Sequence, residues 1–176
     1  MSARLRRRPL EARWCLVANR RVAGGRLQTL FAAVSRLGDG PVWVALGLVI
    51  AVMDAPRGIA VAAHIGIAAL VGGALYRWIK TRTLRPRPYV RYRRIHALVP
   101  PLDEFSFPSG HTLHAVSITT IVLQHYPLLG WLLVPFTVLV AISRVALGLH
   151  YPSDVLAAVG IGLVLGFAPV ARLVVG

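Results

Sequence analysis

Acidic residues and cysteine are scarce in this chain of 176 residues, and each shortage excludes a class of protein. Cys15 is the only cysteine, so neither an intramolecular disulfide nor a cysteine-based zinc site can form. Asp and Glu number 6 against 20 Lys and Arg, for a formal net charge of +14. Charged residues together reach only 15 %, whereas they make up about 25 % of a typical soluble domain. The sequence therefore disfavours an ordinary soluble domain, which needs more polar surface to cover its core.

Apolar residues dominate instead, at 56 % of the chain with a positive mean hydropathy, and this favours the membrane class. A net charge of +14 could favour binding to nucleic acid, to a membrane surface or to an anionic substrate. The basic residues interrupt apolar segments rather than forming one soluble face, which argues against nucleic acid. We therefore expect a membrane protein that binds an anionic ligand and has no nucleic-acid partner.

Five apolar segments predict transmembrane helices, so the expected fold is an all-α integral membrane bundle in a single domain. They cover residues 41–53, 58–78, 111–125, 128–147 and 153–175. The first and third are shorter than the roughly 20 residues of an ordinary span, but turn residues beside them could extend each one. The only long polar stretch, residues 79–110, separates the second predicted span from the third.

Residues 1–40 predict a basic tail followed by an amphipathic helix, ahead of a transmembrane bundle over residues 41–176. Within residues 14–37, apolar side chains recur on one helical face: Leu27, Leu30, Phe31, Val34 and Leu37. Such a helix lies in the membrane interface or packs on a protein core. The same segment could instead supply a sixth span.

The distribution of arginine predicts the orientation of the bundle. The N-terminal segment and the loop 79–110 carry nearly all of the arginines, and the opposite side of a five-span bundle has Arg57, Arg172 and little else. Because basic loops tend to stay in the cytoplasm, we expect the loop 79–110 on the cytoplasmic face. A sixth span at 14–37 would turn that loop to the opposite face.

Three polar clusters stand at the ends of the predicted spans. The first runs from Lys80 to Arg87-Pro88, and the second is Pro108-Ser109-Gly110-His111. The third comprises Ser143-Arg144 and, further on, His150 and Asp154. Counting the spans puts all three clusters on the same side of the membrane, so the sequence predicts that they form one site.

The cations in these clusters predict a site for a multiply charged anion. Lys80, Arg87 and Arg144 would converge with a helix N-terminus, a combination that is typical of a phosphate site. Ser109 and Gly110 precede the helix, so free backbone N–H groups there can point at phosphate oxygens, and Gly110 allows close approach. We interpret the neighbouring arginines as interfacial anchors: Arg82, Arg85, Arg91, Arg93 and Arg94.

Two histidines beside phosphate favour a division of labour, in which one attacks phosphorus and the other protonates the departing oxygen and later activates water. Asp154 follows His150 by four residues, so its carboxylate could accept the ring N–H and fix the other nitrogen as nucleophile. His111 has no such partner nearby in sequence, which suits a general acid. A metal shared by His111 and His114 is disfavoured, because few carboxylates exist to complete its coordination.

These residues resemble the type 2 phosphatidic acid phosphatase superfamily, which includes lipid phosphate phosphatases, bacterial acid phosphatases and vanadium haloperoxidases. The resemblance covers residues 80–154 and leaves no motif position unmatched. It implies a metal-independent phosphatase without a cofactor, in a bacterial plasma membrane, with a phosphohistidine intermediate at His150. His111 would be the acid and base and Asp154 the orienting group, and the phosphate would be surrounded by Lys80, Arg87, Ser109, Gly110 and Arg144.

Headgroup contacts lie outside the motifs, so several lipid substrates stay open. They are an isoprenoid phosphate or diphosphate, phosphatidylglycerophosphate, phosphatidic acid and an isoprenoid-linked sugar phosphate. A non-catalytic protein that binds anionic lipid would need the same cations but not His150 or Asp154. A vanadium haloperoxidase would have a similar pocket, but the predicted spans argue against such a soluble enzyme. Asp103 and Glu104 either balance the basic loop or guard the entrance of the site.

Overall fold

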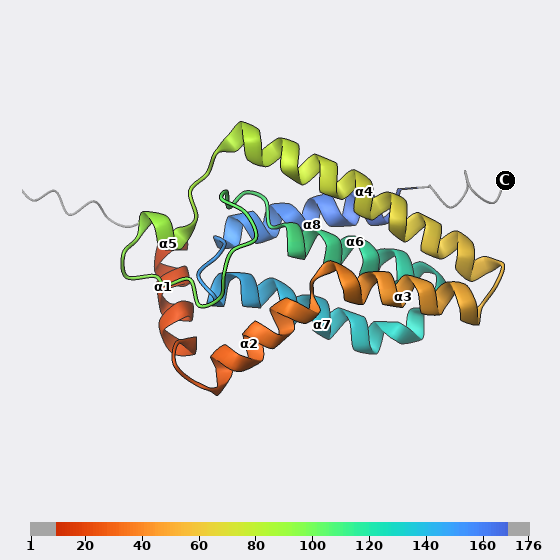
Figure 1. Ribbon diagram of the computed structural model, residues 1–176, viewed down its shortest axis with the longest axis horizontal. Helices are drawn as coiled ribbons and strands as arrows, with labels where there is room; N and C mark the ends of the chain where they lie inside the picture. The colour runs from red at the N-terminus through yellow and green to blue at the C-terminus, as the bar shows by residue number, and fades with distance from the viewer. Residues whose placement is uncertain (1–9, 169–176) are drawn as a thin grey trace, which may run out of the picture.

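A computed structural model describes residues 10–168, which form helices joined by turns and loops (Figure 1). Within those residues there is no β-strand, and Pro86 and Phe105 form an isolated β-bridge. The helices in chain order are α1 (Leu10–Val22), α2 (Arg26–Leu37), α3 (Gly40–Met53), α4 (Arg57–Thr83), α5 (Pro88–Arg91), α6 (Gly110–His125), the 3-10 turn η1 (Pro127–Leu129), α7 (Gly130–Ala146) and α8 (Pro152–Gly166). The predicted all-α class is confirmed for this part of the chain.

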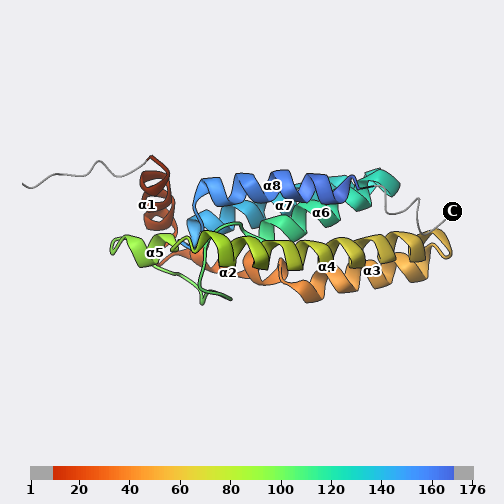
Figure 2. The same ribbon diagram turned by 90° about the horizontal axis from the view of Figure 1, so that it is seen from above.

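The long helices form two layers (Figure 2). One layer contains α6, α7 and α8, the other contains α3 and α4, and α1 lies across one end of the bundle. α6 is the central helix, because it packs against α4, α7 and α8 and every residue from Ala115 to Val122 is buried. The bundle is thus organised around a helix that begins within the second sequence cluster.

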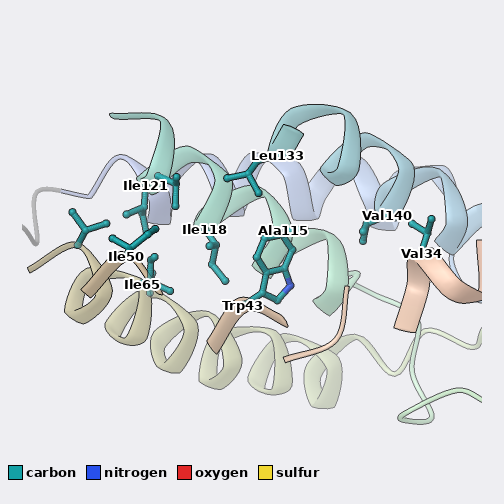
Figure 3. Packing of buried hydrophobic residues seen from close by; sticks show 12 residues of the cluster. Val34, Trp43, Ile50, Ile65, Ala115, Ile118, Ile121, Leu133 and Val140 are labelled. Atoms are coloured by element: carbon teal, nitrogen blue, oxygen red, sulfur yellow. The ribbon is translucent and has the colours of Figure 1, made fainter. Parts of the chain in front are cut away.

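The apolar core lies where α6 meets its neighbours (Figure 3). Trp43 of α3 points toward Ala115 of α6, and Ile65 of α4 belongs to the same cluster as Ile118 of α6. The indole N–H of Trp43 donates to the backbone carbonyl of Gly38 at 3.0 Å, so this large side chain is buried without an unsatisfied donor. These contacts fix α3 and α4 against the central helix.

The outer surface of the bundle is apolar as well. Large side chains such as Leu70 on α4, Trp131 on α7 and Val164 on α8 are mostly exposed. A water-soluble protein rarely exposes apolar surface on this scale, whereas contact with lipid tails accommodates it. The exterior therefore agrees with a membrane location.

Two segments of the described chain are long and apolar enough to cross a membrane, namely α4 and the stretch Pro127–Ala146. α2 and α3 would make a third span if they act as one, although the chain bends by 53° between them. α8 is apolar but has only 15 residues. The structure thus supports two or three membrane-capable segments, and five or six spans stay a prediction.

The apolar face that predicted an amphipathic helix lies wholly within α2, and the earlier part of the segment 14–37 belongs to a separate helix. A turn at Gly24, whose φ of +77° favours glycine, divides the segment into α1 and α2. α1 packs on protein, since the side-chain amide of Asn19 donates to the backbone carbonyls of His96 and Ala146 at 2.9 and 3.1 Å. The protein-packed alternative therefore holds for α1, whereas an interfacial position for α2 stays a prediction.

Candidate active site

The three sequence clusters meet at one end of the bundle, as the order of the predicted spans indicated (Figure 1). α4 ends there shortly after Lys80, and α6 begins there at Gly110. α7 ends shortly after Arg144, and His150 follows in the loop that leads to α8. Arg87 immediately precedes α5 at the same end. Five elements therefore contribute to one site.

A cavity of about 1180 Å³ opens at this end and continues between α3 and α4. Its lining includes Lys80, Arg87, Gly110, His111, Arg144 and His150. Ser109 and Asp154 are fully buried and are not among the lining residues. The backbone N–H of Ser109 donates to the backbone carbonyl of Asp154 at 3.2 Å rather than into the cavity, contrary to our prediction. Ser109 therefore supports the start of α6 from behind the site.

His150 is held by a partner on each ring nitrogen. Its Nδ1 lies 2.6 Å from the backbone carbonyl oxygen of Ser106, and its Nε2 lies 3.2 Å from Nη1 of Arg87. A carbonyl only accepts and a guanidinium only donates, so Nδ1 carries the proton and the lone pair of Nε2 faces Arg87. Burial, and then Arg144 and Arg87, lower the pKa of His150 well below its ordinary value. The ring is therefore neutral near pH 7, the form in which Nε2 can act as a nucleophile.

Asp154 does not make the hydrogen bond to His150 that the sequence spacing predicted. Its Oδ2 is 3.7 Å from Nδ1 of His150 and instead accepts the backbone N–H of Tyr151 at 2.8 Å. Its Oδ1 pairs with Arg85 at 2.6 Å. The carboxylate lies in the first turn of α8, where free backbone N–H groups compete for it. Asp154 thus stabilises the loop that carries His150, while Ser106 orients the ring.

Arg85 links this loop to the N-terminal helix. Besides Asp154, its guanidinium donates to Oγ of Ser153 at 2.8 Å and to Oε1 of Glu11 at 2.5 Å. It also lies over the ring of Tyr151, 4.2 Å from the centroid. The interpretation of Arg85 as an interfacial anchor is therefore wrong. No local pattern distinguished it from the other arginines of the loop, because its partners come from distant parts of the sequence.

Replacing Arg85 by glutamine is expected to lower the free energy of unfolding by about 2 kcal/mol, because the buried carboxylate of Asp154 loses its cation. We expect less than a fully buried pair would cost, since the Arg85 side chain is 26 % exposed. Thermal unfolding in detergent measures the effect. Arg82→Gln is the control, because Arg82 is exposed and contacts the face of Trp78. Equal unfolding temperatures for both variants would show that the pairing of Arg85 with Asp154 does not stabilise the protein.

His111 has a carboxylate partner that the sequence did not reveal. Its Nε2 lies 2.6 Å from Oδ1 of Asp39, which stands at the bend between α2 and α3. The prediction that His111 lacks such a partner held only for its neighbours in sequence, since Asp39 is 72 residues away. A carboxylate at this distance fixes the orientation of the ring. The pair therefore suits a residue that takes part in proton transfer.

Arg144 keeps an unused donor beside the cavity. The side chain is buried, and Nη1 donates to Oγ of Ser35. Its Nε is also buried, and it has no hydrogen-bond partner within residues 10–168. Buried polar atoms are seldom left unpaired, and Arg144 lines the cavity. The free donor therefore suits an oxygen atom of an anionic ligand.

Lys80 and Arg87 are both paired with Asp103, which the sequence placed near the site without assigning it a role. Nζ of Lys80 lies 2.6 and 2.7 Å from the two carboxylate oxygens, and Nη2 of Arg87 lies 2.7 Å from Oδ1. Burial raises the pKa of Asp103, but its hydrogen bonds to Lys80 and its attraction to both cations outweigh burial and lower the pKa below the ordinary value. Asp103 is therefore charged near pH 7 and belongs to the anion site itself.

Fold and site together define a helical protein with an apolar exterior, in which cations and histidines line one cavity. A family model of the PAP2 superfamily matches residues 60–173. The chain belongs to this superfamily, which confirms the resemblance drawn from the three sequence clusters.

Curated relatives of known name match a substantial part of the chain. It is 36 % identical over 104 residues to undecaprenyl-diphosphatase BcrC of Bacillus subtilis (strain 168), an alignment that covers 59 % of this chain and 53 % of that protein. It is 30 % identical over 133 residues to an undecaprenyl-diphosphatase of Sulfolobus acidocaldarius, which covers 74 % and 63 % respectively. The aligned part of the chain thus spans between half and two thirds of the length of these relatives.

Solved structures share the arrangement of the helices over nearly the whole chain. LpxE of Aquifex aeolicus superimposes with a TM-score of 0.77 and 25 % identity, over 92 % of this chain and 95 % of that one. A PAP2 type phosphatidylglycerolphosphate phosphatase from Bacillus subtilis superimposes with a TM-score of 0.71 and 26 % identity, over 93 % and 84 %. The chain therefore shares its fold with LpxE and with a transmembrane phosphatase of the PAP2 type.

Proposed function

We propose that this chain removes a terminal phosphate from a membrane lipid, with His150 as the covalent nucleophile. The observation that carries the proposal is the orientation of His150. Because Ser106 holds the proton on Nδ1, Nε2 is unprotonated and stands beside Arg87 in the cavity. A protein that only bound anionic lipid would have no need for a neutral histidine fixed in this way.

The reaction would proceed in two displacements. In the first, Nε2 of His150 forms a bond to phosphorus while the bond to the lipid oxygen breaks, and His111 donates its proton to that oxygen. In the second, His111 removes a proton from water, which attacks the phosphohistidine and releases inorganic phosphate. Lys80, Arg87 and Arg144 would stabilise the charge on the transferring group in both steps.

The cavity supports a substrate with a long apolar chain. From the anion site it continues between α3 and α4, where small residues line it, including Gly47, Ala62, Gly66, Ala69 and Gly73. The stretch of α4 from Ala62 to Lys80 measures about 27 Å at the rise of an α-helix. The names of the curated relatives favour an isoprenoid diphosphate, so we propose that class first. Phosphatidylglycerophosphate, phosphatidic acid and other isoprenoid phosphates are the next candidates.

Replacing Gly66 by leucine is expected to raise KM for a long-chain isoprenoid diphosphate about tenfold, because the leucine side chain would enter the cavity between α3 and α4 and displace part of the lipid tail. A short-chain substrate that does not reach Gly66 should keep its KM. Initial rates of phosphate release in detergent measure both values. Gly160→Leu on α8 is the matched control: a Cβ at either glycine meets no atom within 4 Å, but only Gly66 lines the cavity. If both variants had equal effects on both substrates, the cavity would not be the binding site of the apolar lipid tail.

The proposed activity is tested by measuring phosphate release from purified protein across isoprenoid diphosphates, isoprenoid monophosphates, phosphatidylglycerophosphate and phosphatidic acid. Excess chelator is present throughout, and we expect the rate to be unchanged by it. If phosphate is released from none of these lipids, the non-catalytic alternative holds, in which the same cations only bind a headgroup. A strict requirement for added metal would contradict nucleophilic attack by His150 as the source of catalysis.

A further inference from the structure

Lys80 has no donor left for a ligand while Asp103 is in place. An ammonium group has three N–H donors. Two of the observed contacts go to the carboxylate oxygens of Asp103, and the third goes to the backbone carbonyl of Phe105 at 3.0 Å. The cation that the sequence predicted as a phosphate ligand is thus fully occupied by groups of the protein.

Arg87 is occupied almost as completely. A guanidinium has five N–H donors. Nε donates to the backbone carbonyl of Asp103, Nη1 contacts the carbonyl of Leu149 and Nε2 of His150, and Nη2 donates to the carboxylate of Asp103. A phosphate oxygen can therefore gain Lys80, and the Nη2 donor of Arg87 that Asp103 uses, only when the carboxylate leaves.

The segment that carries Asp103 is placed so that the carboxylate can leave while the nucleophile stays fixed. The Asp103 side chain is 38 % exposed, against 6 % for Lys80 and 2 % for Arg87. Residues 101–104 are all exposed, whereas Ser106 is buried and its N–H donates to the backbone carbonyl of Arg85 at 2.9 Å. Residues 101–104 can therefore move while Ser106, which orients His150, stays in place.

We propose that Asp103 is a specificity residue, which keeps lipids of single negative charge out of the anion site and yields to a terminal phosphate. The proposal rests on the proposed function, because it concerns the same cations. Membranes present many phosphodiester lipids with one negative charge each. In the absence of Asp103, both Lys80 and Arg87 would be free to bind such lipids at the end of the cavity. Asp103 prevents this binding, because its carboxylate already occupies the position beside Lys80 and Arg87.

The charge of the ligand decides whether it can displace Asp103. A phosphodiester would replace one negative charge by another of the same size, so it gains little from Lys80 and Arg87. A terminal phosphate brings close to two negative charges near pH 7 and three oxygens that can accept hydrogen bonds. The additional charge strengthens its attraction to the cations, and the additional oxygen can accept a further hydrogen bond from Lys80 or Arg87. Only the terminal phosphate therefore gains enough to open the site.

Asp103→Asn tests the proposal, with Glu104→Gln as the matched control that removes the same charge from the next residue. Binding of orthovanadate to the purified protein is measured from its effect on thermal unfolding, with and without excess phosphatidylglycerol in the micelles. We expect Asp103→Asn to bind orthovanadate about tenfold more tightly than the wild type, and phosphatidylglycerol to weaken that binding about tenfold. In the wild type and in Glu104→Gln, phosphatidylglycerol should change the binding little.

Asp103 is not a competitor of the ligand if Asp103→Asn binds orthovanadate more weakly than Glu104→Gln, or if phosphatidylglycerol competes equally in all three proteins. Absence of orthovanadate binding in every protein would also overturn the proposal. If Asp103→Asn does not fold, Asp103→Ser takes its place, since its shorter side chain also carries no charge. Orthovanadate binding requires no turnover, so the result is independent of whether phosphate release is detected.

Discussion

Replacing His150 by alanine is expected to reduce the rate of phosphate release by about 10⁴-fold or more, because the reaction loses the atom that attacks phosphorus. The covalent intermediate should disappear with it. Brief incubation of the wild type with a substrate labelled in its terminal phosphate, followed by quenching in base, should leave label on the protein as acid-labile phosphohistidine. The same treatment of His150→Ala should leave none.

His96→Ala provides the control for this experiment. The side chain of His96 is exposed, and only its backbone groups contact Asn19, so the substitution removes an imidazole without disturbing those hydrogen bonds. We expect wild-type rates from it. Label that persists on His150→Ala, or loss of activity in both variants at equal stability, would show that His150 is not the covalent nucleophile.

Asp39→Asn is expected to lower kcat by about 10²-fold, since the carboxylate 2.6 Å from His111 orients the ring for proton transfer. Binding of substrate, and hence KM, should change much less, because Asp39 adds no positive charge to the anion site. Initial rates over a range of substrate concentrations separate kcat from KM and measure the loss.

Asp54→Asn is the matched control, since Asp54 ends the same helix α3 at the opposite side of the bundle. There its Oδ2 accepts the hydroxyl of Tyr126 at 2.8 Å, so the substitution also costs a hydrogen bond but one far from His111. We expect an unchanged kcat. If kcat is equally unchanged in Asp39→Asn, Asp39 only stabilises the bend between α2 and α3.

The convergence of the three clusters was predictable, because each lies at the end of a helix and consecutive membrane helices alternate in direction. Lys80 near the end of α4 and His111 at the start of α6 are joined by a loop that must return to the same face. The same reasoning brings Arg144 and His150 together across the turn between α7 and α8. These positions depend only on the order of apolar and polar segments, and the sequence displays that order directly.

The carboxylates around the site were not predictable in the same way. Asp39 and Asp103 reach His111 and Lys80 through the packing of whole helices and the path of a loop, for which the sequence has no periodic signal. The predicted hydrogen bond between Asp154 and His150 is absent for a different reason. The spacing of Asp154 from His150 suits a hydrogen bond to the ring, but the start of α8 offers a backbone N–H that the carboxylate accepts instead.

The N-terminal helices show how one glycine can set the limit of a periodic pattern. The apolar spacing over residues 27–37 coincides with α2, and the left-handed backbone at Gly24 ends α1 and redirects the chain into α2. A pair of adjacent glycines was the available signal, because glycine is unfavourable inside a helix. As a result α1 lies across one end of the bundle rather than in line with α2 (Figure 1).

The contact of α1 with the loop around His150 limits which chimeras of this family can work. Glu11 shares Arg85 with Asp154, and Sγ of Cys15 lies 3.6 Å from the backbone carbonyl of His150. The family model nevertheless matches only residues 60–173, which exclude α1. A hybrid that joins this matched region to the first helix of a relative would leave one side of Arg85 unpaired unless the donor helix brings its own carboxylate. Residue 11 and Arg85 should therefore be exchanged together.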